Sequence, residues 1–464
     1  MKSSPAVLLS ETQSLCPICL QRVKARRVAY GDDVYLEKTC GLHGDFRVIV
    51  WRGNPQYGNW SVARQPSTPP VCDTQIDKGC PYDCGLCPDH RQHSCCVLLE
   101  VTSRCNLGCP VCFAQAGSAC DDPTFADIEE WYKKLLASGG PFNIQLSGGE
   151  PTMRDDLPEI IAMGRSLGFG FIQLNTNGLR LATEPGYVQK LKTAGLSCVF
   201  LQFDGTRSDI YEKIRGQSIL AAKEAVVANC TQQGLGVVLV VTLVPGVNTD
   251  NIGDLIKWGL SRAPTVRGVH FQPISYFGRY PLTPKDCDRI TLPELMREIE
   301  RQTDGNVQAT DLRPPGGENA YCSFHGNFVV MPNGELQALA AAAHPAGSCQ
   351  SAVAADGAKK AQAFVAKRWT FPAAKAELAA EICVGDCCGI NVDSLDSFLG
   401  RVEQYSFCIS AMAFQDVWNL DLDRLRDCFI HVLAPDGKLI PFCAYNLTSQ
   451  SGEGLYRSGL VSQP

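Results

Sequence analysis

The cysteines are the feature that most restricts what this chain can fold into. There are 24 of them in 464 residues, and they form dense groups near both ends of the chain. The three in the middle, Cys198, Cys230 and Cys287, stand in apolar or helical contexts and are interpreted as packing residues. Disulfide scaffolds are short secreted chains, whereas clustered cysteines in a long chain more often bind metal or take part in catalysis.

Charge and hydropathy exclude several classes of protein. The formal net charge is −6, from 42 basic and 48 acidic side chains, and nucleic-acid binding needs a basic face instead. No apolar run approaches the roughly 20 residues that span a bilayer. The short apolar stretch 6–9 is too brief for a signal peptide, so a cytoplasmic location is expected.

The chain divides into three regions that differ in composition and in predicted secondary structure. Residues 1–95 are loop-rich and rich in cysteine, residues 96–303 alternate strands with helices, and residues 304–464 hold an Ala-rich stretch and a Cys-bearing tail. The predicted strands are Val97–Thr102, Phe142–Leu146, Phe171–Asn175, Cys198–Phe203, Val237–Leu243 and Gly268–Pro273. The predicted helices are Asp127–Ala137, Leu157–Leu167, Tyr187–Ala194, Ile219–Gln233, Asn251–Leu260 and Leu292–Arg301. This α/β alternation predicts parallel strands, in either a partial barrel or an open doubly wound sheet.

The spacing C-x3-C-x2-C directly follows the first strand of this alternation, at Cys105, Cys109 and Cys112. Three thiolates in a tight loop can ligate three irons of a [4Fe–4S] cubane and leave the fourth iron without a protein ligand. An open coordination position distinguishes a reactive metal site from a closed structural one.

Polar residues follow the next strands. Gly148, Gly149 and Glu150 come after the second strand, where glycine permits close approach of a ligand and the carboxylate can accept hydrogen bonds from an amine. Asn175 and Asn177 end the third strand. Such residues at the C-terminal ends of parallel strands are typical of the active sites of α/β barrels.

Together these motifs resemble the radical S-adenosylmethionine (SAM) superfamily. The resemblance implies a partial (β/α)6 TIM-like barrel over about residues 96–275, flanked by Cys-rich N-terminal and C-terminal metal-binding regions. It also implies that SAM chelates the open iron, that Gly148, Gly149 and Glu150 hold its methionyl amine, and that Asn175 and Asn177 lie nearest its ribose or carboxylate. The bound cluster would supply one electron to cleave SAM to a 5′-deoxyadenosyl radical. An electron donor such as ferredoxin or flavodoxin is therefore expected as a partner.

A second C-x3-C-x2-C occurs at Cys80, Cys84 and Cys87, with Cys95 eight residues further on. Four thiolates predict a closed auxiliary [4Fe–4S] cluster, and a zinc site that uses some of them is the alternative. Cys96 or Cys72 could take the place of Cys95. His90 and His93 are expected to lie behind the ligands or to face solvent.

Near the N-terminus, Cys16-x2-Cys19 and Cys40-x2-His43 predict a tetrahedral site for one Zn or Fe ion, with unmetallated cysteines as the alternative. The basic run 22–27 between these pairs is interpreted as a solvated face, with a weak peripheral contact to anionic headgroups at the inner membrane face as the alternative.

Several of these stretches, with 272–279, 414–421 and 435–446, are similar to the group that contains archaeal tetraether lipid synthase and its bacterial relatives, also named hydroxymethylpterin methylase. The resemblance implies a further cluster at Cys408, Cys428 and Cys443. Its fourth ligand is left open among Cys322, Cys383, Cys387 and Cys388. It also implies hydrogen abstraction from a lipid alkyl chain and C–C coupling. The alternatives are radical methylation of a pterin or similar small molecule, and a non-catalytic iron–sulfur or zinc scaffold.

Overall fold

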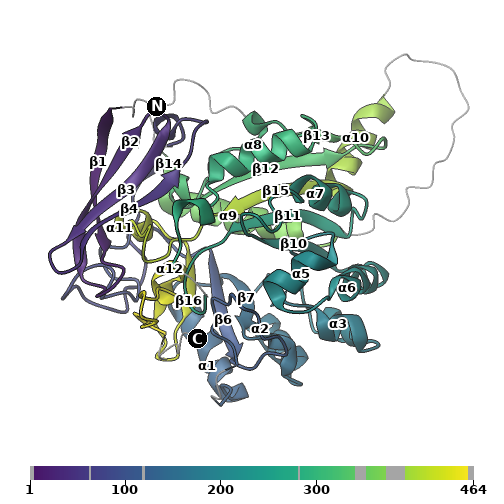
Figure 1. Cartoon of the computed structure of the whole chain (residues 1–464). Helices are drawn as coiled ribbons and strands as arrows, with labels where there is room; N and C mark the ends of the chain where they lie inside the picture. The colour runs from purple at the N-terminus through teal and green to yellow at the C-terminus, as the bar shows by residue number, and fades with distance from the viewer. Residues whose placement is uncertain are drawn as a thin grey trace, which may run out of the picture.

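The N-terminal region forms its own small sheet. The computed structural model describes residues 5–61, 64–117, 121–280, 283–339, 352–372 and 392–457. Four antiparallel strands pair in chain order and stand beside the main body of the molecule (Figure 1). They are β1 (Ala6–Leu15), β2 (Arg22–Tyr30), β3 (Asp33–Cys40) and β4 (Gly44–Trp51). Successive side chains of each strand point to opposite faces of this sheet. On one face, Ala25, Leu36 and Val48 are buried against the main body.

The six predicted strands form the parallel centre of a large mixed sheet. They are β6 (Cys96–Thr102), β7 (Asn143–Gly148), β8 (Ile172–Thr176), β9 (Cys198–Gln202), β10 (Gly236–Leu243) and β11 (Val266–Pro273). Each pairs in parallel with the next, so the alternation of strands and helices correctly predicted their order. Their bounds lie within two residues of the predicted ones, because each is a short apolar run between turn residues.

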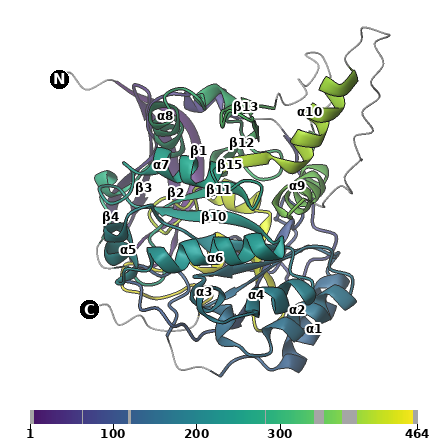
Figure 2. The ribbon, with the colours of Figure 1, turned by 90° about the vertical axis from the view of Figure 1, so that its right-hand side faces the viewer.

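Helices connect these strands and cover the outer surface (Figure 2). They are α1 (Phe125–Ala137), α2 (Leu157–Ser166), α3 (Leu179–Thr183), α4 (Tyr187–Thr193), α5 (Ser208–Arg215), α6 (Leu220–Gln233), α7 (Ile252–Leu260) and α8 (Leu292–Gln302). The short helices α3 and α5 were not predicted, because one or two turns carry too little periodicity to be recognised. No helix within the described ranges is long and apolar enough to cross a membrane.

The C-terminal region extends this sheet at both edges. Strand β15 (Ser406–Met412) pairs in parallel with β11, and β16 (Ile430–Leu433) pairs in parallel with β6. Strands β12 (Ser323–Val330), β13 (Leu336–Ala338) and β17 (Leu439–Pro441) add antiparallel pairs outside them. One sheet therefore spans the boundary predicted near residue 303, and among the described residues eight neighbouring strands run parallel.

Helix α9 (Ala354–Trp369) lies across the end of the barrel at which the strands begin. Asn143 at the start of β7 donates its amide to the Gln362 carbonyl at 3.0 Å. Arg267 near the start of β11 donates to the Arg368 carbonyl at 2.9 Å. Gly236 at the start of β10 has no room for a side chain, since a Cβ there would lie 2.3 Å from the Trp369 carbonyl oxygen. The helix thus closes the barrel at the end opposite the predicted cluster.

The remaining elements tie the C-terminal region to its surroundings. They are β5 (Arg64–Gln65), β14 (Ala352–Val353), α10 (Val392–Gln404), α11 (Leu422–Arg426) and α12 (Phe442–Tyr445). On the N-terminal sheet, Arg27 donates two hydrogen bonds to Asp421 at 2.7 and 2.8 Å. The segment before α11 also supplies Asp416, which accepts two bonds from Arg289 at 2.8 and 3.0 Å. Both members of this second pair are buried, so neither charge has water as an alternative partner.

Asp416→Ala is expected to lower the free energy of unfolding by about 3–5 kcal/mol, because it leaves the Arg289 guanidinium buried without a counter-charge. Thermal unfolding under anaerobic conditions measures the change. The matched control is Glu130→Ala, which removes an exposed partner of Lys133 and should cost less than about 0.5 kcal/mol. Equal effects of the two substitutions would contradict a structural role for the buried pair.

Candidate active site and metal centres

The predicted cluster loop follows β6 and is held by a segment that follows β11. The backbones of Cys112 and Arg279 exchange two hydrogen bonds, both 3.0 Å long. The Arg279 side chain donates from Nε to the Cys109 carbonyl at 3.1 Å. As a result, the thiols of Cys105, Cys109 and Cys112 line one cavity. Burial raises the pKa of the Cys105 thiol to about 11.

The two glycines after β7 let the backbone pack directly against this loop. Gly149 N–H donates to the Thr102 carbonyl at 2.7 Å, and Glu150 N–H donates to the Arg104 carbonyl at 2.8 Å. A Cβ at Gly148 or at Gly149 would lie 2.2 Å from one of these carbonyl oxygens. The glycines are therefore required for contact between two strand ends, in addition to the ligand approach expected from the sequence.

The Glu150 carboxylate is buried and joins β7 to β8. Its Oε1 accepts a hydrogen bond from Thr176 Oγ1 at 2.6 Å, and its Oε2 accepts one from Asn177 N–H at 2.7 Å. Asn177 in turn donates from Nδ2 to Asn106 Oδ1, in the cluster loop, at 2.7 Å. Glu150 thus fixes the strand end that carries Asn175 and Asn177. Its predicted contact with a ligand amine stays a prediction.

A buried ion pair stands beside Cys109 and was not anticipated from the sequence. Arg215 at the end of α5 donates two bonds to Asp204, at 2.7 and 2.8 Å, and one to Thr242 Oγ1 at 3.0 Å. Burial raises the pKa of the Cys109 thiol, and the Arg215 guanidinium opposes that rise. The available signal was Asp204, a charged residue directly after the predicted strand Cys198–Phe203.

The interior of the barrel is a cavity of about 570 Å³ that begins at the three thiols. Alternate residues of the parallel strands face it, as the period of two requires. Six of them are carboxamides: Asn143, Gln145, Gln173, Asn175, Gln202 and Gln272. Gln173 donates to Gln145 at 2.6 Å across β7 and β8. Asn143, Gln145 and Gln173 were not predicted as site residues, although single polar residues that alternate within apolar strands are a recognisable signal.

The far end of the cavity is apolar and aromatic. Helix α9 presents Phe364, Val365 and Trp369 along one face. Trp369 stacks on Phe200 of β9 with ring centroids 5.2 Å apart. The cavity therefore has a carboxamide-rich part along the strands and a mainly aromatic part against α9, which Asn143, His270 and Lys360 also line.

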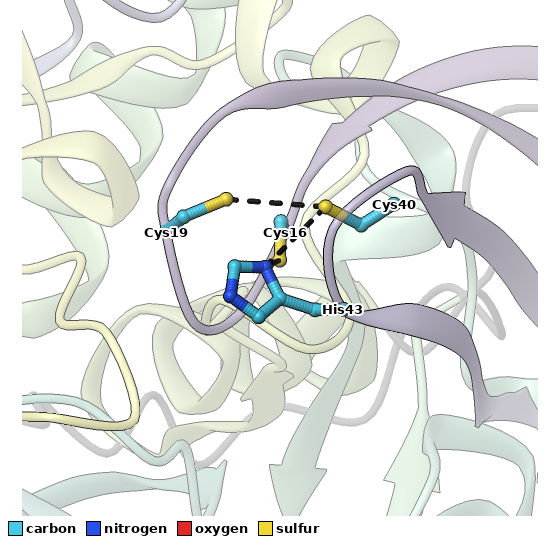
Figure 3. A group of neighbouring side chains, drawn as sticks. All are labelled: Cys16, Cys19, Cys40 and His43. Atoms are coloured by element: carbon cyan, nitrogen blue, oxygen red, sulfur yellow. Dashed lines mark hydrogen bonds between the residues drawn. The ribbon is translucent and has the colours of Figure 1, made fainter.

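The N-terminal cysteines and histidine gather as predicted. Figure 3 shows Cys16 and Cys19 from one loop facing Cys40 and His43 from another, and their ligand atoms all lie within 4.8 Å of one another. A tetrahedral zinc ion with bonds of about 2.0–2.3 Å needs ligand atoms about 3.3–3.8 Å apart, and His43 Nδ1 lies 3.5 Å from the sulfurs of both Cys16 and Cys40. A backbone hydrogen bond from Leu42 and the His43 side chain lower the pKa of the Cys40 thiol to about 6, which favours the thiolate ligand.

The second cysteine group is only partly assembled as predicted. Cys80, Cys84 and Cys87 line one small pocket. The predicted fourth ligand Cys95 lines the barrel cavity instead, as does its alternative Cys96. The other alternative, Cys72, is exposed. Cys95 is held on the barrel side because its N–H donates to the Phe429 carbonyl at 2.8 Å.

The C-terminal group also differs from the predicted set. Cys322, Cys428 and Cys443 interact electrostatically: burial is the largest cause of the raised pKa of Cys428, and Cys443 and Cys322 raise it further. Arg424 donates to Cys322 Sγ at 3.4 Å. Cys408 lies instead on β15 and lines the barrel cavity. Three other candidates fall outside the described residues: Cys383, Cys387 and Cys388.

Known protein families match two regions of the chain. Residues 99–259 match the radical SAM superfamily, and residues 8–52 match the HMPTM N-terminal zinc ribbon domain. The chain is 34% identical to the 7,8-dihydro-6-hydroxymethylpterin dimethyltransferase of Methanocaldococcus jannaschii, over 94% of this chain and 93% of that protein. The chain belongs to the radical SAM superfamily.

Two more distant similarities cover only part of this radical SAM chain. A probable GTP 3′,8-cyclase of Methanothermobacter marburgensis is 26% identical over 54% of this chain and 85% of its own. The crystal structure of SuiB from Streptococcus suis bound to its precursor peptide SuiA is 16% identical, with a TM-score of 0.40, over 47% of each chain.

Membership of the superfamily identifies the chain as an enzyme that uses SAM and a [4Fe–4S] cluster, and it removes the scaffold alternative. The structure fits these cofactors, because three thiols converge on a cavity that is also lined by the Gly148–Glu150 backbone and by Asn175 and Asn177. The zinc ribbon match and the gathered Cys16, Cys19, Cys40 and His43 fit an additional metal ion.

The C-terminal cysteines generate a prediction about metal content. Cys322→Ser should remove one cluster's worth of iron and sulfide from the anaerobically reconstituted protein, because Cys322 lies with Cys428 and Cys443. Cys408→Ser is the matched control and should keep the full complement, because Cys408 faces the barrel cavity. Iron and sulfide analysis measures both, and loss of a cluster in Cys408→Ser alone would support the set predicted from the sequence.

Proposed function

We propose that this radical SAM enzyme methylates a pterin or a closely related heteroaromatic small molecule. The observation that carries the proposal is the set of carboxamides inside the barrel. A pterin ring has several N–H donors and ring acceptors around its edge, and carboxamides can match both. A saturated alkyl chain could not pair with the donors and acceptors that these carboxamides leave open toward the cavity, and a buried polar group without a partner costs about 1–3 kcal/mol. The name of the M. jannaschii relative, a 7,8-dihydro-6-hydroxymethylpterin dimethyltransferase, supports the same substrate class.

In this proposal Cys105, Cys109 and Cys112 hold the reactive cluster at the C-terminal ends of the strands. Gly148, Gly149, Asn175 and Asn177 contact SAM, and Glu150 keeps the last two in place through its bonds to Thr176 and Asn177. When bound, the cluster and SAM supply a 5′-deoxyadenosyl radical. The electron comes from a donor such as ferredoxin or flavodoxin.

The barrel's residues position the substrate and exclude water. Gln145 and Gln173 orient the heterocycle by hydrogen bonds, and α9 closes the far end of the cavity with Phe364 and Trp369. Water exclusion protects a carbon radical from side reactions. Auxiliary clusters at the Cys80 and Cys322 groups belong to the same proposal.

A second candidate, C–C coupling of lipid alkyl chains as in tetraether lipid synthase, is favoured by one observation. The α9 end of the cavity is apolar and aromatic, and Phe200 and Trp369 provide a surface on which an alkyl chain can pack. The comparisons support the pterin reading more strongly than this one, although the lipid reading was the first expectation from the sequence.

One assay tests the function. The reconstituted enzyme with SAM, dithionite and a 7,8-dihydropterin should form 5′-deoxyadenosine and a product that has gained a methyl group, with a second SAM as the methyl donor, which leaves as S-adenosylhomocysteine. Mass spectrometry detects the 5′-deoxyadenosine and the methylated pterin. Cys105→Ala should abolish both products. Loss of two hydrogens from an added lipid, with no change to the pterin, would replace the first proposal by the second.

A substitution inside the cavity tests the role of the carboxamides. Gln173→Leu should raise KM for the pterin about tenfold, with a smaller effect on kcat, because one hydrogen bond worth about 1.4 kcal/mol is lost. Steady-state kinetics measure the split between KM and kcat. Gln232→Leu on the exposed side of α6 is the control and should change neither. An unchanged KM in Gln173→Leu would show that the substrate does not reach this part of the barrel.

A further inference from the structure

The pocket that holds Cys80, Cys84 and Cys87 contains a fourth side chain that can bind metal. His90 lines this pocket with the three thiols, and Cys95 does not. The imidazole is buried, with 5% of its surface exposed. Asp89 also lines the pocket, but its side chain is exposed to solvent. The sequence spacing is therefore C-x3-C-x2-C-x2-H, and all four members come from one short loop.

The hydrogen bonds of His90 determine which ring nitrogen is available. Nε2 lies 2.8 Å from the Cys428 carbonyl oxygen, which can only accept, so Nε2 carries the hydrogen. Its second neighbour, His431 Nε2 at 3.3 Å, then acts as an acceptor. His431 completes the chain by donating from Nδ1 to Ser94 Oγ at 3.0 Å. Within the described part of the chain, Nδ1 of His90 has no hydrogen-bond partner, so its lone pair is left for a metal.

This arrangement is the usual one for a metal-binding histidine. Such residues almost always donate their second ring N–H to a carbonyl or carboxylate, which fixes the ring and its tautomer. Here the Cys428 carbonyl takes that role, and the His431 ring packs against His90 with centroids 5.1 Å apart.

The three thiols of this loop suit a cluster. Three thiolates in a tight loop can ligate three irons of a [4Fe–4S] cubane, which leaves the fourth iron for a further ligand. Among the described residues, only the Cys16 group has three or more ligand atoms within 4.8 Å of one another.

We propose that His90, through Nδ1, is the fourth protein ligand of an auxiliary [4Fe–4S] cluster held by Cys80, Cys84 and Cys87. The proposal replaces the predicted ligand Cys95. It rests on the presence of an auxiliary cluster and makes no use of the substrate assignment. A neutral imidazole in place of a thiolate makes the cluster less negative, which raises its reduction potential, as histidine ligands do in other iron–sulfur proteins.

The test uses the full-length chain with Cys105, Cys109 and Cys112 changed to Ala, which removes the SAM-binding cluster and any nitrogen signal from SAM. The protein is reconstituted anaerobically with zinc in the N-terminal site, reduced with dithionite and studied by pulsed electron paramagnetic resonance. A directly coordinated nitrogen should give a strong coupling that changes when ¹⁵N-histidine is incorporated.

Three further variants in this background identify the ligand. His90→Cys should keep the cluster, lose the nitrogen coupling and show a lower midpoint potential. Cys95→Ala should keep the iron, the coupling and the potential. Asp89→Ala should do the same.

Some results would overturn the proposal. They are the absence of a histidine coupling in the parent protein, its survival in His90→Cys, or loss of the cluster in Cys95→Ala or Asp89→Ala. The proposal would also be overturned if, after reconstitution, the Cys80 site held zinc or no metal instead of a cluster. None of these readouts depends on methyl transfer, so failure of the proposed function would leave the result unchanged.

Discussion

The contact between two strand ends at Gly149 is the constraint on which the site depends. Because neither Gly148 nor Gly149 has a side chain, the backbone after β7 bonds directly to Thr102 and Arg104 at the start of the cluster loop. Glu150 then extends the connection to Thr176 and Asn177 at the end of β8. Three neighbouring strands are thereby locked at the edge where the thiols stand. Any side chain larger than hydrogen at Gly149 would push the loop away from the residues predicted to hold SAM.

The sequence was informative wherever the determining interactions are local. The six central strands follow from apolar runs between turns, and the Cys16 site follows from two pairs of ligands brought together at the ends of antiparallel strands. The two strands that flank the six central ones were not predicted, because β15 and β16 are defined by partners far away in the chain: Cys408 pairs with Gly268, and Ile430 pairs with Cys96. No periodicity within residues 406–433 encodes those pairings.

The auxiliary cysteines likewise fall into two kinds: some are placed by their spacing within a loop, and others by contacts with distant parts of the chain. Cys80, Cys84 and Cys87 come together because seven or fewer residues separate them along the chain. Cys95 is removed from the group by its bond to Phe429, and Cys408 is removed from its group by the register of β15. Cys322 takes its place beside Cys428 only after the chain has folded. Spacing thus predicts which thiols can meet within a loop, whereas tertiary pairing decides the rest.

The support of the cluster loop has a consequence for how the enzyme is made. Arg279 bonds to the Cys109 carbonyl, and Arg457, near the end of the described chain, donates to the Ala114 carbonyl and to Glu100 of β6. The ribosome must therefore translate past Arg457 before this loop acquires its final shape. Until then the three thiols stand on a loop that lacks the support of these two arginines.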